Sequence, residues 1–179
     1  MHSFSKPELR LLLAAARASR ERDWLMILVA FWHGLRASEV IAITPNSLRD
    51  GHITVKRLKG SLKTVQPLIE HEDPLLNEKA PLIEFMRGMH RNQKLFPISR
   101  QHVWRIVSKH TRAAGLPKHM GHPHILKHTI AMQSIESAGI ENTRQWLGHR
   151  SIASTGAYLR VTDGQAATAV TKALGARPL

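Results

Sequence analysis

The feature that most constrains the fold is one hairpin-like stretch in a chain whose other apolar residues are spaced as in helices. Residues 52–59 alternate between apolar and polar side chains, and after Gly60-Ser61 residues 62–69 alternate again until Pro67. Alternation with a period of two is typical of half-buried strands, and a short break containing glycine joins such strands into a hairpin. We therefore expect a mainly α fold with a small antiparallel β-sheet, which is the α+β class.

Helix signals surround this hairpin. Ser5 can accept a hydrogen bond as an N-cap and Glu8 completes a capping box, so a helix is expected to begin there. Apolar residues at helical spacing then predict a buried face of Leu9, Leu12, Leu13 and Ala16. Further helices are expected over residues 22–33, 37–42, 79–90, 99–114, 123–138, 142–147, 152–159 and 165–174.

Length and composition limit both the architecture and the chemistry. The 179 residues suffice for one well-packed core, so we expect a single domain over residues 1–179. The chain has no cysteine, which excludes disulfides, thiolate zinc sites and cysteine nucleophiles. The longest apolar stretch, residues 24–32, is too short to cross a bilayer, and the N-terminus lacks a secretory pattern. A cytoplasmic protein with no membrane partner is expected.

The charge balance points to a polyanionic partner. Twenty-six Lys and Arg stand against thirteen Asp and Glu, which gives a formal net charge of +13. Such an excess is typical of proteins that bind nucleic acid. Ribosomal proteins, RNA-binding proteins and proteins that sit on anionic membranes share it, so charge alone leaves these classes open.

The chain contains one tyrosine, Tyr158, nine residues after His149. A phenol has a pKa of about 10, so its attack on an electrophile requires a proton acceptor and cations nearby. Cations and imidazoles gather in four segments that are far apart in the sequence, at predicted helix ends or turns: residues 34–39, 57–60, 122–128 and 147–158. Side chains at such positions can converge on one anion.

Each of these groups also has an ordinary structural interpretation when it is taken alone. Arg36 could be an ordinary surface arginine, and His149 could be a histidine that interacts with the dipole at a helix end. Tyr158 could be a core residue whose hydroxyl is hydrogen-bonded. His122 and His124 lack a nearby cysteine or carboxylate pair. We therefore predict that the chain has no metal site.

The segment after Pro123 favours an anion. If Pro123 opens a helix, His124, Lys127 and His128 share one face of its first turns. Backbone N–H groups at a helix N-terminus attract negative charge. His128 is expected to be structural, with its ring bonded to backbone inside the fold.

The joint pattern is far more specific than its parts. In chain order it consists of Gly34-x-Arg36-x-Ser38-Glu39, the hairpin lysine Lys59, His124-x-x-Lys127-His128, Leu147-Gly148-His149 and Tyr158. This order resembles the catalytic domain of the tyrosine recombinases, or phage integrase family, over nearly the whole chain, and it implies that fold. Residues 33–39, 57–60, 99–101 and 147–150 look most like the short fimbrial phase-variation invertases of the family.

The resemblance implies a site-specific DNA recombinase. Tyr158 would attack a DNA phosphodiester and form a 3′-phosphotyrosyl enzyme with a free 5′-hydroxyl, which rejoins after strand exchange. Arg36 and His149 would bind the non-bridging oxygens, Lys59 would protonate the leaving oxygen, and His124 would act as general base. No metal, nucleotide or other cofactor is needed, because the phosphotyrosyl bond retains the energy of the broken linkage.

One position departs from the family pattern. Lys127 stands where the family has an arginine in His-x-x-Arg-His. An ammonium keeps the charge but cannot offer the planar fork of a guanidinium to two phosphate oxygens. We expect a slowed but competent enzyme.

The resemblance also concerns partners. The expected partner is double-stranded DNA, bound by a homotetramer that is a monomer when free, with strongly salt-dependent affinity. Candidate DNA contacts are Arg57, Arg105, Lys109 and Arg112. Many members carry a separate N-terminal DNA-binding domain, and none is expected here because the first catalytic-domain helix begins at Ser5.

Two other functions remain open from the sequence. A type IB topoisomerase-like enzyme would use the same groups to nick and relax DNA. A DNA-binding regulator would retain the fold while Lys127 marks a decayed site. The target sequence and the direction of recombination are not encoded in any recognisable motif.

Overall fold

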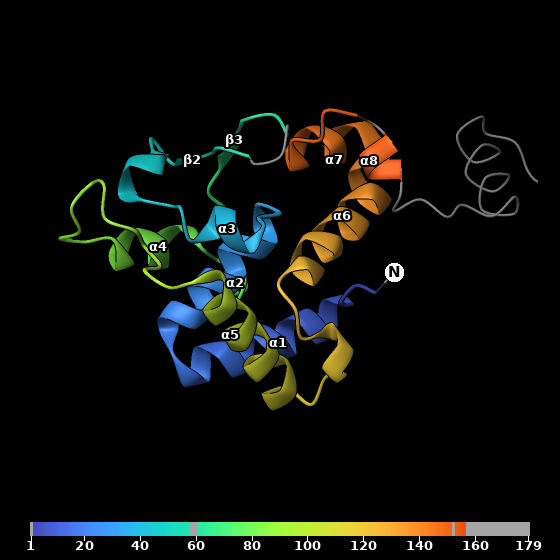
Figure 1. Cartoon of the computed structure of the whole chain (residues 1–179), viewed down its shortest axis with the longest axis horizontal. Coiled ribbons are helices and arrows are strands. Elements are labelled where there is room, and N and C mark those ends of the chain that lie inside the picture. Colours follow the sequence, from blue (N-terminus) through green and yellow to red (C-terminus); the bar gives the residue numbers. More distant parts are fainter. Residues whose placement is uncertain (1, 58–60, 152, 157–179) are drawn as a thin grey trace, which may run out of the picture.

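The computed structural model describes residues 2–57, 61–151 and 153–156, which form helices around one small sheet (Figure 1). The described elements, in chain order, are α1 (Lys6–Ser19), α2 (Glu21–Trp32), α3 (Ala37–Val40), η1 (Pro45–Ser47), β1 (Leu48–Arg49), β2 (His52–Val55), β3 (Thr64–Pro67), α4 (Lys79–Phe85), α5 (Arg100–Ala113), η2 (Lys118–Met120), α6 (His124–Ala138), α7 (Ile140–Leu147) and α8 (Ala153–Gly156). The predicted α+β class is confirmed.

The helices are arranged around α2. In Figure 1, α1, α2 and α5 form the lower part of the molecule, and α6 rises from it to α7 and α8. The short α3 lies between the sheet and α6. This arrangement brings the starts of α3 and α6 and the end of α7 toward one region.

The N-terminal helix begins as the sequence predicts. The Ser5 side chain accepts a hydrogen bond from the Glu8 N–H, and the Glu8 carboxylate accepts one from the Ser5 N–H at 2.8 Å. This reciprocal capping satisfies two backbone donors that a helix start otherwise leaves open. The four predicted core residues of α1, Leu9, Leu12, Leu13 and Ala16, are all buried, which confirms the predicted face.

The core is centred on α2. Every residue of this helix from Asp23 to Phe31 is buried, because α1 packs on one side and α6 on another. One cluster of buried apolar side chains extends from Phe4 to Leu147. Burial of this kind contributes about 25 cal/mol per Å² of apolar surface and is the main stabilising force available to the scaffold.

The sheet contains one strand more than expected. The predicted hairpin forms from β2 and β3, with Val55 opposite Thr64, and β1 adds to its other side in the order β1-β2-β3. Asp50 and Gly51 join β1 to β2 with φ of 51° and 72°. Two successive positive φ angles are typical of the tight turns that Asp-Gly favours in hairpins.

Some predicted boundaries were wrong. The helix expected over residues 79–90 ends at Phe85, because the chain turns through Gly88 with a φ of 77°. The helix expected at 142–147 begins earlier, at Ile140. The helix at 165–174 and part of that at 152–159 lie outside the described residues. Within the described ranges, no helix is long and apolar enough to cross a membrane.

Two glycines allow neighbouring segments to come unusually close. Gly34, in the turn between α2 and α3, has a φ of 57°, and a Cβ there would lie 2.4 Å from the Leu147 side chain of α7. Gly148 follows α7 with a φ of 67°, and a Cβ there would lie 2.6 Å from the Leu62 carbonyl oxygen. The α2–α3 turn, α7 and the chain before β3 are therefore packed without room for a methyl group.

Gly148→Ala tests this packing. We expect it to lower the free energy of unfolding by about 2–4 kcal/mol, from left-handed backbone strain plus the collision with Leu62. Gly115→Ala is the matched control, because Gly115 has a φ of 70° and nothing within 4 Å of the added Cβ. The control should lose only about 1–2 kcal/mol in urea unfolding. Equal losses of unfolding free energy for Gly148→Ala and Gly115→Ala would contradict the close approach of Gly148 to the Leu62 carbonyl.

Candidate active site

Arg36 lies at the first of three convergent segments, directly before α3. Its backbone N–H donates to Glu39 Oε2 at 2.9 Å, and its Nη1 donates to Glu39 Oε1 at 2.9 Å. The Arg36 side chain is 27% exposed, whereas that of Glu39 is fully buried. The carboxylate of Glu39 thus orients a guanidinium that still reaches the surface.

Lys127 lies in the first turns of α6 and is almost completely buried, with 1% of its surface exposed. Its Nζ has no hydrogen-bond partner among the described residues. Burial, followed by the charges of Arg57 and Arg36, lowers the pKa of Lys127 to about 7, while Glu39 opposes the shift. A buried ammonium without a partner is costly, so this position is poised to receive an anion.

His149 follows α7 and is also buried. Its Nδ1 lies 2.9 Å from the Thr155 hydroxyl, and its backbone carbonyl accepts a hydrogen bond from Arg144. Burial, then the charges of Lys127 and Arg36, lowers the pKa of His149 to about 4. The ring is therefore neutral at pH 7, and if Nδ1 accepts the Thr155 proton, Nε2 carries the N–H that can donate to an anion.

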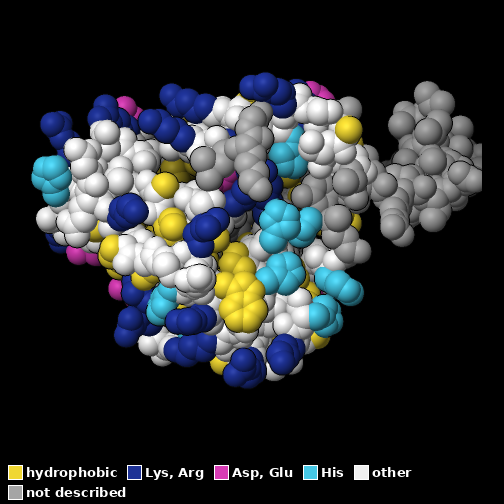
Figure 2. Space-filling model, viewed as in Figure 1, with side chains coloured by type: hydrophobic (Ala, Val, Ile, Leu, Met, Phe, Trp, Pro, Cys, Tyr) yellow, Lys and Arg dark blue, Asp and Glu magenta, His cyan; other side chains and the backbone are white. Residues whose placement is uncertain are grey.

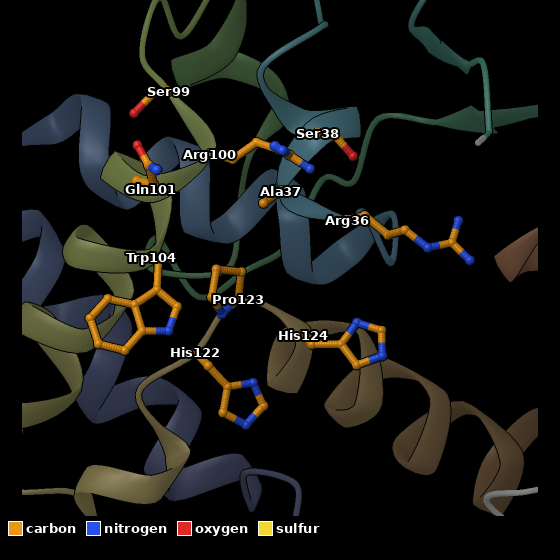
Figure 3. A pocket seen from close by; sticks show the side chains of 10 residues that line it. All are labelled: Arg36, Ala37, Ser38, Ser99, Arg100, Gln101, Trp104, His122, Pro123 and His124. Carbon is orange, nitrogen blue, oxygen red and sulfur yellow. The ribbon is translucent and has the colours of Figure 1, made fainter. Parts of the chain in front are cut away.

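His124, at the start of α6, faces an open cleft. The cleft has a volume of about 850 Å³ and is also lined by Arg36, by His122 and by the start of α5 (Figure 3). Burial, then the charges of Lys127, Arg36 and His122, lowers the pKa of His124, which favours the neutral ring that can accept a proton. The His128 ring packs edge-on against His124, with 4.5 Å between centroids.

The structure therefore brings four predicted site residues together. The charge of Arg36 lowers the pKa of Lys127, and the charges of Arg36 and Lys127 both lower the pKa of His149 and of His124. Figure 2 shows Lys, Arg and His side chains across this face, with few Asp or Glu between them. Such a cluster can hold a phosphate and stabilise the charge that develops on it.

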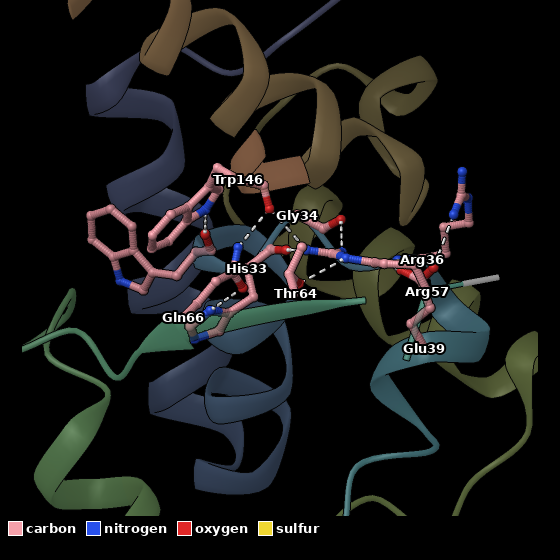
Figure 4. Close-up of polar contacts among 9 residues, drawn as sticks. His33, Gly34, Arg36, Glu39, Arg57, Thr64, Gln66 and Trp146 are labelled. Atoms are coloured by element: carbon pink, nitrogen blue, oxygen red, sulfur yellow. Dashed lines mark hydrogen bonds and ion pairs between the residues drawn. The ribbon is translucent and has the colours of Figure 1, made fainter. Parts of the chain in front are cut away.

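The prediction that Arg57 contacts DNA was wrong. Its side chain is fully buried, and five acceptors match its five N–H donors within the described residues (Figure 4). Arg57 follows β2 at a position that points inward like Ile53 and Val55. No donor is left for a phosphate.

The other predicted residues divide into two groups. Arg105, Lys109 and Arg112 are exposed on α5, but Arg105 and Lys109 border a separate hollow near Ser19, away from the cleft that His124 lines. Their contact with DNA stays a prediction. Lys59 and Tyr158 lie outside the described residues.

Sequence reasoning missed the residues that support the site. Glu39 belongs to the Gly34-x-Arg36-x-Ser38-Glu39 motif but had no predicted role, although an acidic residue three positions after Arg36 at a helix start is a signal for this pairing. Thr155 has no comparable signal, because its contact with His149 depends on how α8 folds back. Among the described residues, no group of three His, Cys, Asp or Glu could hold a metal ion.

The depressed pKa of Lys127 gives a testable pH dependence of stability. The folded state lacks the Lys127 proton between about pH 7 and the ordinary 10.5, whereas the unfolded chain binds it. The burial cost is therefore full below pH 7 and disappears as the pH approaches 10.5. We expect Lys127→Met to be more stable than the native chain by about 2–4 kcal/mol at pH 6, with a gain that shrinks toward pH 10.

Urea unfolding at pH 6, 8 and 9.5 measures this difference. Lys127→Arg is the matched control, since a guanidinium keeps its proton across this range. The difference in unfolding free energy between Lys127→Arg and Lys127→Met should therefore stay the same as the pH rises. A gain for Lys127→Met that does not change with pH would contradict the depressed pKa.

Comparison with known proteins agrees with this geometry. Residues 3–165 match the phage integrase family. The type 1 fimbriae regulatory protein FimE of Escherichia coli K12 is 31% identical over 150 residues, which cover 79% of this chain and 75% of FimE. The resemblance to fimbrial members of the family is thereby confirmed.

Solved structures share the fold. A crystal structure of XerA recombinase superimposes with a TM-score of 0.75 at 23% identity. The superposition covers the whole of this chain and 66% of the XerA chain. A crystal structure of a lambda integrase tetramer bound to a Holliday junction superimposes with a TM-score of 0.69 at 20% identity, over 87% of this chain. The chain spans only 47% of that integrase. With its motifs in order and its cations converged on one site, the chain belongs to the phage integrase family of tyrosine recombinases.

Proposed function

We propose that this chain is a site-specific recombinase that cleaves and rejoins double-stranded DNA through a phosphotyrosyl bond to Tyr158. The observation that carries the proposal is the convergence of Arg36, His124, Lys127 and His149 from three separate segments. Family membership supports the same reaction. The 3′-phosphate would remain on the tyrosine while the 5′-hydroxyl leaves, and the reverse attack would seal the recombined strand.

Each described side chain suits a distinct part of this reaction. Arg36, held by Glu39, and the neutral His149 would donate hydrogen bonds to the non-bridging oxygens. Lys127 would supply a positive charge beside the same phosphate. The exposed, neutral His124 would accept the proton of Tyr158, and Lys59 would give a proton to the leaving oxygen.

The cleft gives a path for the DNA. Its wall at the start of α5 carries Arg100, Gln101 and the Trp104 ring, and Trp104 is 52% exposed. Arg100 extends from α5 toward α3, next to the segment that begins with Arg36 (Figure 3). Arginine and glutamine are side chains that read base edges, and an exposed ring can contact a base or a thymine methyl. This wall therefore replaces Arg57 as the surface for DNA beside the scissile phosphate.

The expected assembly follows the family. The lambda integrase tetramer holds a Holliday junction, and a strand exchange between two duplexes needs four cleavage sites. The chain would therefore act as a homotetramer on DNA and remain a monomer when free. Its place would be the nucleoid in the cytoplasm. Relatives include a tyrosine recombinase, XerA, and the chain belongs to the phage integrase family, so recombination is favoured over a relaxing topoisomerase or a regulator without activity.

A covalent adduct tests the reaction. The native chain should form a protein–DNA adduct with nicked duplexes that carry randomised sequence around the nick. The short fragment with the free 5′-hydroxyl diffuses away after cleavage, so the strand cannot be resealed and the phosphotyrosyl bond persists. Tyr158→Phe should form none, and denaturing gels read both. If the native chain forms no adduct with any duplex of the pool, the chain is a DNA-binding module. If it relaxes supercoils and gives no recombinant from paired sites, it is a topoisomerase.

Lys127→Arg tests the departure from the family. Restoring the guanidinium fork should raise the cleavage rate by up to about tenfold. Removing an entire oxyanion-hole donor lowers the rate of an enzyme by about 10²–10³-fold, and the effect here should be smaller because the lysine already supplies the charge. The rate is measured as single-turnover cleavage of a nicked duplex that forms the covalent adduct with the native chain. Equal rates for the two proteins would show that the missing fork does not limit the chemistry.

A further inference from the structure

His149 is held at three points by its neighbours. Its backbone N–H donates to the Arg144 carbonyl at 3.0 Å, and its backbone carbonyl accepts from Arg144 Nη1 at 2.9 Å. Glu141 Oε1 in turn accepts from Nε and Nη2 of Arg144 at 2.8 and 2.6 Å. The third point is the ring, whose Nδ1 lies 2.9 Å from the Thr155 hydroxyl. Within the described residues, Nε2 is therefore the ring nitrogen left to act on a ligand.

The bond between Thr155 and His149 has one favourable direction. Thr155 is fully buried, and Nδ1 of His149 is the one hydrogen-bond partner of its hydroxyl in the part of the chain that the structure describes. If the hydroxyl donates to Nδ1, both groups are satisfied. If Nδ1 donated instead, the buried hydroxyl proton would lack an acceptor among these residues, which is costly. Nδ1 is therefore the acceptor.

The charge state of the ring then fixes the place of its single proton. Burial, followed by the charges of Lys127 and Arg36, lowers the pKa of His149 to about 4, so the ring is neutral at pH 7. A neutral imidazole has one N–H group and one acceptor nitrogen. Since Nδ1 accepts, the N–H group lies on Nε2.

The neighbouring cations would not select this tautomer by themselves. Arg36 and Lys127 lie close enough to lower the pKa of His149, and Lys127 Nζ has no hydrogen-bond partner among the described residues. Positive charge attracts a lone pair and repels the positive end of an N–H group. Charge alone thus favours a lone pair on the ring edge that faces the cations, so another group has to select the N–H.

We propose that Thr155 is a positioning residue that holds His149 in the Nε2–H tautomer, so that the ring meets a phosphate oxygen with a donor. This role rests on the proposed function, in which His149 binds a non-bridging oxygen of the scissile phosphate. A ring with its lone pair on Nε2 would repel the same oxygen. Thr155 touches none of the reacting atoms and acts only through the ring.

Nuclear magnetic resonance of the native chain tests the tautomer directly. Two-bond ¹H–¹⁵N correlation of protein labelled with ¹⁵N-histidine, recorded at pH 7, distinguishes a protonated ring nitrogen from an unprotonated one. His149→Gln identifies the signals of His149 by their loss. We expect a protonated Nε2 and an unprotonated Nδ1. The opposite result in the native chain would overturn the proposal, and this measurement needs no folded variant of Thr155.

Thr155→Val tests whether the hydroxyl selects the tautomer. It removes the hydroxyl and nearly keeps the size of the side chain, and the ratio of Nε2–H to Nδ1–H rings should fall about tenfold, the effect of one hydrogen bond. Thr155→Ser retains a hydroxyl and should keep the native ratio. An unchanged ratio in Thr155→Val would overturn the role.

Thr143→Val is the matched control. Thr143 is a buried threonine of α7, and its hydroxyl donates to the Gly139 carbonyl at 2.9 Å rather than to His149. This change also removes a buried hydroxyl and should leave the tautomers of His149 unchanged. An equal change of the ratio in Thr143→Val and Thr155→Val would overturn the specific role of Thr155.

Cleavage connects the tautomer to the reaction. The rate of single-turnover cleavage of an adduct-forming nicked duplex, at a protein concentration too low to saturate the DNA, should fall in proportion to the fraction of Nε2–H rings. A lower fraction in Thr155→Val with an unchanged rate would overturn the positioning role. A native chain that forms no adduct would overturn the proposed function, while the tautomer measurement would still decide the assignment of Thr155.

Discussion

The rest of the structure depends on a concentration of positive charge around one buried carboxylate. The charges of Arg57 and Arg36 lower the pKa of the buried Lys127, and Glu39 is the one negative charge among the described residues that opposes this shift. Two like charges about 6 Å apart repel by roughly 3 kcal/mol at an effective dielectric constant near 20. Cations this close to one another are electrostatically unfavourable, and a phosphate among them would turn this repulsion into attraction.

The scaffold has to supply the free energy that this arrangement costs. The wholly apolar middle of α2, enclosed by α1 and α6, provides a large buried surface next to the charged region. Helix caps and the close glycine contacts then leave the segments little freedom to relax apart. Sites of this kind trade stability for activity, and Lys127, which is buried with no hydrogen-bond partner in the part of the chain that the structure describes, is a direct instance.

Much of this fold could be read from local patterns, since the Ser5 capping box, the buried face of α1 and the β2–β3 hairpin follow from spacing alone. The strand β1 was missed because two residues are too short for an alternation pattern, although the Asp50-Gly51 turn signalled it.

The site could be predicted as a set of residues but not as an arrangement. The order of the motifs named Arg36, His124, Lys127 and His149, which the fold brings together. The misplacement of Arg57 has a physical reason: basic residues are usually exposed, and that expectation outweighed the period-two pattern that places it on the side of Ile53 and Val55. The roles of Glu39 and Thr155 depend on contacts between side chains that spacing does not determine.

The lack of space at Gly34 and Gly148 has a consequence for how such a chain can diversify. The segments that carry Arg36 and His149 pack against α7 and the chain before β3 at distances that leave no room for an added methyl group, so these segments tolerate little change. Arg100, Gln101 and Trp104 on the α5 wall take no part in the hydrogen bonds of Arg57. Under the proposed function, chemistry and recognition would lie on separate elements, and the α5 surface proposed to meet the bases could change over evolutionary time while the segments of Arg36 and His149 stay constant.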